Sequence, residues 1–207
     1  EEAVGVLKSE HRIEPGLAVV LLGEDPASQI YVRNKARQAQ ELGMSSFEYR
    51  MLADTSQKKL LDRIEALNKD PSVHGILVQL PLPNHLDSKT ILHTVSPNKD
   101  VDGFHPENLG LLLEGNPNFI PCTPHGVLEI LRHYDISVSG RHAVIVGRSN
   151  IVGKPMFALL AQKFEMGNAT VTICHTGTKD LAAYTKQGDI IIAAAGSPNM
   201  ITADMIK

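Results

Sequence analysis

Four polar residues in the first half of the chain have types and spacing that could bind a polar substrate and move a proton. Tyr31 and Lys35 are four residues apart, so they share one face of a helix. Gln79 ends an apolar run, and Asp102 lies in a polar stretch after the next helical pattern. Ligands of open parallel sheets bind beyond the carboxyl ends of the strands. We therefore expect the lysine, the glutamine and the aspartate to converge at one rim of a sheet.

Each of these residues also has an ordinary structural explanation. Tyr31 and Lys35 repeat the Tyr-x-x-x-Lys pair of short-chain dehydrogenases, but in that family the pair follows the nucleotide-binding loop, and here it precedes the candidate loop. The order excludes that family and leaves a surface tyrosine and lysine as the alternative. Gln79 could be an amide that caps a strand end. Asp102 could be a turn residue, because Asp-Gly is a strong turn signal and Gly103 follows it.

The main signal in the second half is a loop bounded by Gly147 and Gly153, between an apolar run and a helical pattern. Loops of this kind aim backbone N–H groups and a helix N-terminus at a phosphate. Arg148 and Ser149 lie inside the loop. The spacing is not G-x-G-x-x-G, and an ordinary strand-to-helix turn is the alternative explanation.

The sequence after the next strand bears on the choice of cofactor. NAD enzymes usually place an acidic residue at the end of that strand, on the ribose 2′-hydroxyl. Here the strand ends at Cys174, and the segment 175–178 holds no carboxylate. Arg148 is available for a 2′-phosphate. The missing acid and the available base favour NADP over NAD.

Strand-like and helical segments alternate through the first half. We expect strands at 17–23, 47–51 and 74–80 and helices at 26–42 and 88–95, with a helical stripe of Leu60, Leu61, Ile64 and Leu67 between them. Asp25 is the expected N-cap of the first helix. Asp54 and Gln57 resemble a capping box for the second. Residues 96–106 are expected to form a loop.

The second half repeats this alternation, with expected strands at 142–147, 170–174 and 189–195 and helices at 123–133, 153–164 and 179–186. Alternation at this spacing predicts an α/β protein with parallel sheets in two domains. We place the domains at residues 1–120 and 121–207. Thr202 begins another expected helix, and a dinucleotide fold needs further strands after it. The C-terminal domain therefore reads as Rossmann-like and truncated, part of a longer native chain.

Composition excludes several other classes of protein. The net charge is −3, which indicates neither nucleic-acid binding nor a membrane-binding face. The longest apolar runs are far shorter than the ~20 residues of a bilayer span. Cys122 and Cys174 read as reduced thiols of a cytoplasmic protein. We expect no metal site, because the Cys122-x-x-His125 pair has no second pair. His105, His125 and His175 read as polar loop residues.

Five motifs occur in the order of a known family. They are Tyr31-Val-Arg-Asn-Lys35, Val78-Gln-Leu-Pro-Leu-Pro83, Lys99-Asp-Val-Asp-Gly-Phe-His105, Pro121-Cys-Thr-Pro124 and Gly147-Arg-Ser-Asn-Ile-Val-Gly-Lys-Pro155. Over nearly its whole length the chain resembles the bifunctional methylenetetrahydrofolate dehydrogenase/methenyltetrahydrofolate cyclohydrolase family, in its bacterial single-polypeptide form.

The resemblance implies NADP-dependent oxidation of 5,10-methylenetetrahydrofolate to the 5,10-methenyl form and its hydrolysis to 10-formyltetrahydrofolate. These are steps of one-carbon metabolism. It also implies a folate-binding N-terminal domain, a homodimer formed through the NADP domain, and folate in the cleft between the domains.

The resemblance assigns the site residues by motif. Lys35 would be the catalytic lysine, with Tyr31 stacked on the folate rings, Gln79 bonded to Lys35, and Asp102 on the pterin. Val78 and Leu80 flank Gln79 in the folate-binding motif. The cofactor residues carried over are Gly147, Arg148, Ser149 and Thr176. A lysine in a partly dry cleft can shuttle protons near neutrality, and a neutral glutamine orients it without holding it as a cation.

Two departures and two rivals qualify the assignment. The family often has Ser and a basic residue where this chain has Thr176-Gly177, which weakens the NADP argument. Its chain also continues beyond Lys207 through a further strand, a glycine-rich segment and a returning helix. The rivals are a non-catalytic dinucleotide-binding module and another two-domain dehydrogenase, such as one acting on shikimate or amino acids. The intact polar set opposes the first rival, and the complete motif strings oppose the second.

Overall fold

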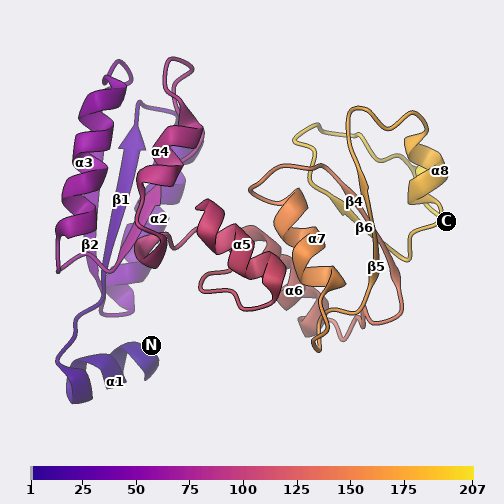
Figure 1. Cartoon of the computed structure of the whole chain (residues 1–207), viewed down its shortest axis with the longest axis horizontal. Helices are drawn as coiled ribbons and strands as arrows, with labels where there is room; N and C mark the ends of the chain where they lie inside the picture. The colour runs from indigo at the N-terminus through magenta and orange to yellow at the C-terminus, as the bar shows by residue number, and fades with distance from the viewer. Residues whose placement is uncertain (1) are drawn as a thin grey trace. The chain divides into compact units, whose positions relative to one another are not determined.

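The computed structural model describes residues 2–207. The chain divides into two compact units, and the division falls between Val101 and Asp102. Each unit contains a three-stranded parallel sheet (Figure 1). In chain order the elements are α1 (Glu2–His11), β1 (Gly16–Leu22), α2 (Pro26–Glu41), β2 (Ser45–Met51), α3 (Gln57–Lys69), β3 (Gly75–Val78), α4 (Ser88–Thr94), the 3₁₀ turn η1 (Pro97–Lys99), α5 (Pro106–Glu114), α6 (Cys122–His133), β4 (His142–Val146), α7 (Gly153–Ala161), β5 (Thr170–Cys174), α8 (Leu181–Thr185), β6 (Ile190–Ala193) and the 3₁₀ turn η2 (Ala203–Met205).

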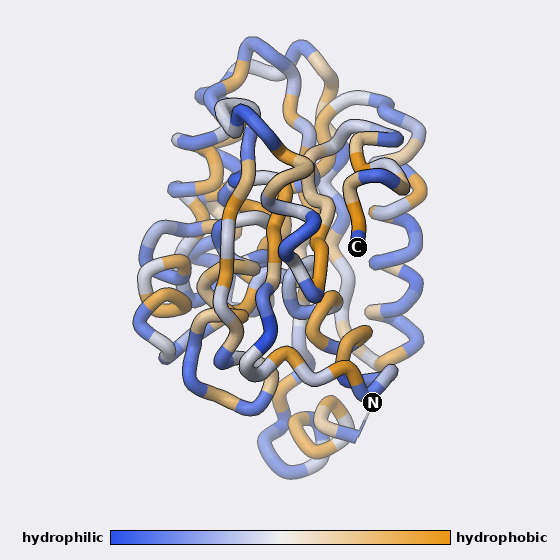
Figure 2. The backbone as a smooth tube through the Cα atoms, turned by 90° about the vertical axis from the view of Figure 1, so that its right-hand side faces the viewer, coloured by the Kyte–Doolittle hydropathy of each residue, from blue (hydrophilic) through white to orange (hydrophobic). Residues whose placement is uncertain are grey.

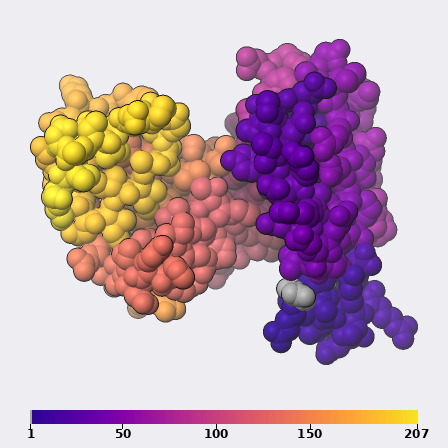
Figure 3. All heavy atoms as spheres, turned by 180° about the vertical axis from the view of Figure 1, so that it is seen from behind, coloured from indigo at the N-terminus to yellow at the C-terminus, as the bar shows by residue number. Residues whose placement is uncertain are grey.

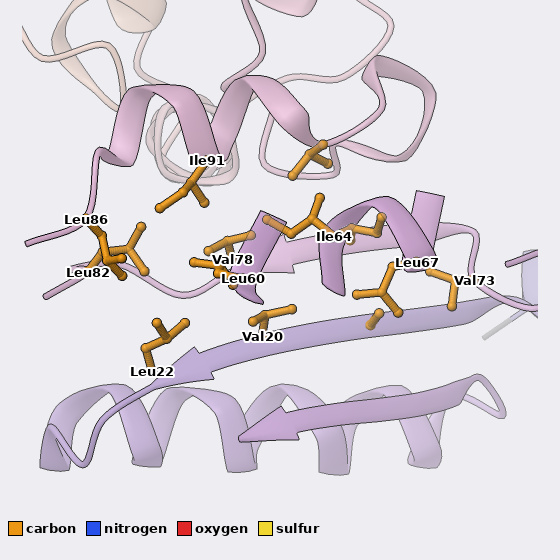
Figure 4. Close-up of a cluster of buried hydrophobic side chains, with 13 residues drawn as sticks. Val20, Leu22, Leu60, Ile64, Leu67, Val73, Val78, Leu82, Leu86 and Ile91 are labelled. Carbon is orange, nitrogen blue, oxygen red and sulfur yellow. The ribbon is translucent and has the colours of Figure 1, made fainter. Parts of the chain in front are cut away.

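The first sheet has the strand order β2-β1-β3, with β1 buried in the centre. On one face, Leu60, Ile64 and Leu67 of α3 and Ile91 of α4 pack in a closed apolar cluster (Figure 4). On the other face, Val32 of α2 packs against neighbouring strand residues. The central strand is apolar on both faces because helices cover both of them. α1 buries none of its side chains and lies at the surface of this unit (Figure 3).

The second sheet has the order β5-β4-β6, and β4 is its buried central strand. Helices α5, α6 and α7 contribute Leu112, Leu128 and Met156 to the cluster on one face. Leu181 of α8 and Met200 pack on the other. In Figure 2 hydrophobic stretches run through the extended segments at the centre of the view, and hydrophilic stretches are frequent on its outer turns. In both sheets the chain leaves the central strand first to one side and later to the other. The carboxyl end of each central strand is therefore a topological switch point, where α/β proteins bind ligands.

The two-sheet α/β architecture expected from the sequence is confirmed, and several local expectations need correction. Asp25 does cap α2, since its carboxylate accepts from the Ser28 N–H at 2.8 Å. The expected capping box of Asp54 and Gln57 is wrong, because Ser56 is the N-cap of α3.

Several other boundaries also differ from expectation. The helix expected at 153–164 ends at Ala161, the helix expected at 179–186 is Leu181–Thr185, and the strand expected at 189–195 is Ile190–Ala193. The strand expected at 74–80 is only Gly75–Val78. The helix expected from Thr202 is the short 3₁₀ turn η2. Part of the expected loop 96–106 forms η1, and α5 follows it. The proposed boundary between ligand-binding domains at 120 and 121 concerns function and stays a prediction.

Candidate active site and cofactor site

The lysine and the glutamine selected from the sequence are in contact in the first unit. The Lys35 ammonium Nζ donates to the Gln79 Oε1 atom at 3.2 Å. Gln79 Nε2 donates to the Leu80 carbonyl at 2.8 Å, and the Gln79 backbone N–H donates to the Val20 carbonyl at 2.9 Å. The amide is therefore held at both ends, with its oxygen facing the lysine. Lys35 and Gln79 are both partly buried.

Strand alternation and helix spacing bring the two side chains together. Leu77 of β3 packs on the face that Val32 of α2 covers. Gln79 is two residues beyond Leu77, so it points to that same face. Lys35 is three residues beyond Val32, so it lies on the side of α2 that meets the sheet. The hydrogen bond between Lys35 and Gln79 therefore lies next to the apolar packing of β3 against α2.

The other expected folate-binding residues occupy different environments. Tyr31 is one helical turn before Lys35 and is 59% exposed, so its ring is free to meet a planar ligand. Val78 is 3% exposed and belongs to the apolar cluster on the α3 face. Only its backbone could reach a substrate. Leu80 is partly buried against the same cluster.

Asp102 is the first residue of the second unit and precedes Gly103, whose φ is +67°. The Asp-Gly turn is therefore confirmed. The segment before it is tied to α3, because the Lys99 Nζ atom donates to the carbonyls of Leu67 at 3.1 Å and Asp70 at 2.7 Å. These bonds satisfy carbonyls at the helix end and fix the start of the loop that carries Asp102.

The glycine-bounded loop in the second unit makes a very close turn at the carboxyl end of β4. Gly147 has φ +129°, and a Cβ there would collide with the Ala194 carbonyl. A Cβ at Gly153 would collide with the Gly147 carbonyl. Both positions require glycine because backbone fills the space that a side chain would need. The turn leads directly into α7, and its tightness allows a ligand to approach the backbone.

Ser149 has a structural role that the sequence did not reveal. Its hydroxyl oxygen accepts from the backbone N–H groups of Val152 at 3.1 Å and Gly153 at 3.4 Å. Ser149 therefore ties the loop to the residues that begin α7, whose N-cap is Val152. Its hydroxyl proton is not used in these bonds and could be donated to an anion.

A cavity of about 480 Å³ lies beside this loop and brings the expected cofactor residues together. Its lining residues are Val146, Gly147, Arg148, Ser149, His175, Thr176, Thr178, Leu181, Ala194, Ala195, Met200 and Met205. Among these described residues none is acidic, and Arg148 contributes a guanidinium. The lining combines apolar side chains, such as Leu181 and Met200, with polar ones. Such a cavity suits a flat heteroaromatic ring joined to phosphates.

His175, Thr178, Leu181 and Met200 line this cavity but were not selected as site residues from the sequence. His175 could have been found by its position directly after a predicted strand. Beneath it, burial raises the pKa of the Cys174 thiol, while a hydrogen bond from Thr178 acts in the opposite direction. Cys174 is therefore a core residue and not a nucleophile. Within residues 2–207, no group of three or more His, Cys, Asp or Glu could hold a metal ion. No helix of that range is long and apolar enough to span a bilayer.

Two parallel sheets, each with polar side chains beyond the carboxyl end of its central strand, are the arrangement of an α/β protein whose second unit resembles dinucleotide-binding domains. The sequence profile of the tetrahydrofolate dehydrogenase/cyclohydrolase catalytic domain matches residues 1–102. The profile of the NAD(P)-binding domain of the same enzymes matches residues 121–207. The chain belongs to the tetrahydrofolate dehydrogenase/cyclohydrolase family.

Individual relatives agree with this membership. The bifunctional protein FolD of Chlorobium phaeovibrioides is 57% identical over 195 residues, which cover 93% of this chain and 66% of the relative. The crystal structure of the Campylobacter jejuni FolD methylenetetrahydrofolate dehydrogenase/cyclohydrolase has a TM-score of 0.92 at 50% identity and covers 100% of this chain and 72% of that one.

The Trypanosoma brucei methylenetetrahydrofolate dehydrogenase-cyclohydrolase, solved with NADP and an inhibitor, has a TM-score of 0.91 at 36% identity. That comparison covers 100% of this chain and 70% of the Trypanosoma brucei chain. The chain thus spans about two thirds of the length of the Chlorobium phaeovibrioides relative, whose matched share is 66%.

Proposed function

We propose that this protein oxidises 5,10-methylenetetrahydrofolate to the 5,10-methenyl form with NADP and hydrolyses the product to 10-formyltetrahydrofolate. Family membership supports the substrate class and both reactions. The observation that carries the assignment of residues is the 3.2 Å hydrogen bond from Lys35 Nζ to Gln79 Oε1. It pairs an ionisable amine with an amide that is itself fixed in orientation.

The oxidation needs positioning more than proton transfer. A hydride leaves the methylene carbon, and the lone pairs of the two adjacent folate nitrogens stabilise the resulting cation. Bound NADP supplies the hydride acceptor. No side chain has to gain or lose a proton, so the protein contributes by holding the reacting carbon in place. Tyr31 is exposed and one turn from Lys35, which suits stacking on the pterin.

The hydrolysis does need proton transfer. Water adds to the methenyl carbon, the bond from that carbon to N5 breaks, and N5 takes up a proton, with one proton released overall. A group that can both accept and donate a proton is required within reach. In the described part of the first unit, Lys35 is the ionisable group bonded to Gln79. A neutral partner at 3.2 Å orients the amine without the strong charge pairing that a carboxylate would bring.

The cavity of the second unit fits NADP in three respects. Backbone fills the space where a Cβ would stand at Gly147 and Gly153, so a phosphate can approach the turn closely. Ser149 keeps a hydroxyl proton for an anion, and Arg148 lines the cavity. We assign Arg148 and Thr176 to the 2′-phosphate and Gly147 and Ser149 to the pyrophosphate.

The remaining roles follow the family resemblance. We assign residues 1–120 to folate binding. In this assignment Val78 contacts the folate through its backbone, Leu80 contacts it through its side chain, and Asp102 binds the pterin. We assign residues 121–207 to cofactor binding and to a homodimer contact, and we place the enzyme in the cytoplasm. Sedimentation at several protein concentrations tests the dimer.

The substitution Lys35→Gln tests the proposed function. Glutamine keeps the polarity and most of the length but cannot titrate. The cyclohydrolase rate should fall by ~10²–10⁴-fold, the usual contribution of a positioned proton-transfer group. Dehydrogenase activity should survive at a reduced level because only placement is disturbed. The measurement is the parallel initial rates of NADPH formation and of methenyltetrahydrofolate decay.

Lys59→Gln is the matched control, because Lys59 is an exposed lysine on α3 and its change should leave both rates as in the parent. A Lys35→Gln protein that hydrolyses normally but no longer forms NADPH would refute the role of Lys35. A parent protein with neither activity would refute the proposed function.

A further inference from the structure

The turn that follows β5 is closed by hydrogen bonds between its first and last residues, His175 and Thr178. The Thr178 N–H donates to the His175 carbonyl at 2.8 Å, and the His175 N–H donates to the Thr178 hydroxyl oxygen at 2.9 Å. Inside the turn, the Gly177 N–H donates to His175 Nδ1 at 3.0 Å. Thr176 is the exposed residue at the tip. Its position therefore depends on bonds made by the residues on either side.

The bond to Nδ1 defines what the imidazole does. A ring nitrogen that accepts a hydrogen bond carries no proton, so in this turn His175 acts as an acceptor through Nδ1. Asn and Asp side chains commonly accept from the N–H two residues later and so stabilise a turn. His175 makes the same connection, to Gly177, with a ring nitrogen in place of a carboxamide oxygen.

The absence of a side chain at Gly177 leaves room for the His175 ring. A Cβ at position 177 would lie 3.0 Å from His175 Cε1 and 3.2 Å from Nδ1, which is tight, and Gly177 avoids that crowding. His175 and Thr178 line both the cofactor cavity and a neighbouring cavity of about 660 Å³. The turn is therefore part of the wall between the two. Loosening it would change the cofactor cavity at the side where Thr176 lies.

We propose that His175 is a positioning residue for cofactor selection, which rests on the proposed function. Its ring, which accepts at Nδ1, fixes the turn 175–178 and thereby holds Thr176 toward the 2′-phosphate end of the cavity that Arg148 also lines. Thr178 supports the same turn through its hydroxyl oxygen. The effect is on NADP more than on NAD, because the two cofactors differ only at the 2′ position.

The test compares His175→Asn with His175→Leu in the protein, with NADP and NAD affinities measured by titration calorimetry. Asparagine retains an acceptor for the Gly177 N–H, and leucine retains bulk but no acceptor. In the leucine variant the ratio of NAD to NADP dissociation constants should fall about three- to tenfold, the usual effect of one hydrogen bond. The asparagine variant should keep the parent ratio. His125→Leu, at an exposed histidine of α6, is the matched control.

A second pair of variants covers the case in which leucine prevents folding. Thr178→Val removes the acceptor for the His175 N–H with little change of shape and should also lower the ratio of NAD to NADP dissociation constants. Thr178→Ser keeps the acceptor and should keep the ratio of the parent protein. An unchanged ratio in His175→Leu or Thr178→Val would overturn the inference. So would an asparagine variant as impaired as the leucine variant. A parent protein that binds neither cofactor would overturn the proposed function itself.

Discussion

Replacing Gln79 with glutamate tests the idea that the partner of Lys35 must be neutral. Glutamate has the shape of glutamine, so the chain need not move. Two interactions change. The side chain can no longer donate to the Leu80 carbonyl, which accepts at 2.8 Å in the parent. In place of an amide oxygen, a carboxylate stands 3.2 Å from Lys35 Nζ.

The size of the effect follows from that distance. Two unit charges 3.2 Å apart interact by about 1.3 kcal/mol at the dielectric constant of water and by about 5 kcal/mol at an effective value of 20. The first figure alone reduces the neutral fraction of the amine about tenfold. Because Lys35 is partly buried, the true interaction lies between these limits. We expect the cyclohydrolase rate of Gln79→Glu to fall at least tenfold and the dehydrogenase rate much less.

The assay is the pair of initial rates, for NADPH formation and methenyltetrahydrofolate decay, measured on one preparation across a range of pH. The cyclohydrolase loss should shrink as the pH rises, since higher pH restores the neutral amine. Gln40→Glu adds the same charge at an exposed position of α2 and serves as control. Equal losses in both reactions, or a cyclohydrolase loss that does not change with pH, would show that the neutrality of Gln79 is not what matters.

Three further predictions concern the second unit. Arg148→Ala should weaken NADP by about tenfold to a hundredfold relative to NAD, as expected for one charge-assisted bond, and titration of both cofactors measures it. Hydrogen bonds from the His142 N–H and the Lys207 ammonium lower the pKa of Asp189 from 3.8 to about 2. Because the folded pKa is depressed, this stabilisation is present above about pH 4 and disappears as the pH falls toward 2; urea midpoints should show that loss in the parent and not in Asp189→Asn. Gly147→Ala should destabilise the unit by at least ~1–3 kcal/mol and abolish cofactor binding, because φ is +129° there; normal binding by a stable variant would contradict this.

That Lys35 and Gln79 come near each other was predictable from regular geometry, whereas the hydrogen bond between them was expected only from the family resemblance. The sequence places Lys35 on a helix with a strong N-cap at Asp25, and places Gln79 at the end of an apolar run. Parallel strands then bring their carboxyl ends to one edge. These are properties of helix and strand periodicity, so one sequence suffices to see them. The neutral amide at position 79 was also read directly from the residue type.

Other features depended on contacts that no local pattern specifies. Asp54 and Ser56 are both good capping residues two positions apart, and it is Ser56 whose side chain accepts from the Lys59 N–H at the start of α3. Ser149 was predicted to line the cofactor phosphates, and its hydrogen bonds to the N–H groups at the start of α7 depend on how tightly the Gly147 turn closes. The part played by His175 depends on which ring nitrogen faces Gly177, and residue identity does not determine that.

Among residues 2–207, each of the four buried apolar clusters contains residues of one unit alone. The Lys35–Gln79 pair that we propose for proton transfer lies beside a cluster of the first unit, and the cavity proposed for the cofactor is lined by residues of the second. Mutations that share no partners generally have additive effects on free energy. Under the proposed function, substitutions that alter the choice of nucleotide can therefore accumulate in the second unit without lowering the stability of the first unit. A lineage could exchange NADP for NAD, or lose hydrolysis while keeping oxidation, by separate and largely independent evolutionary routes.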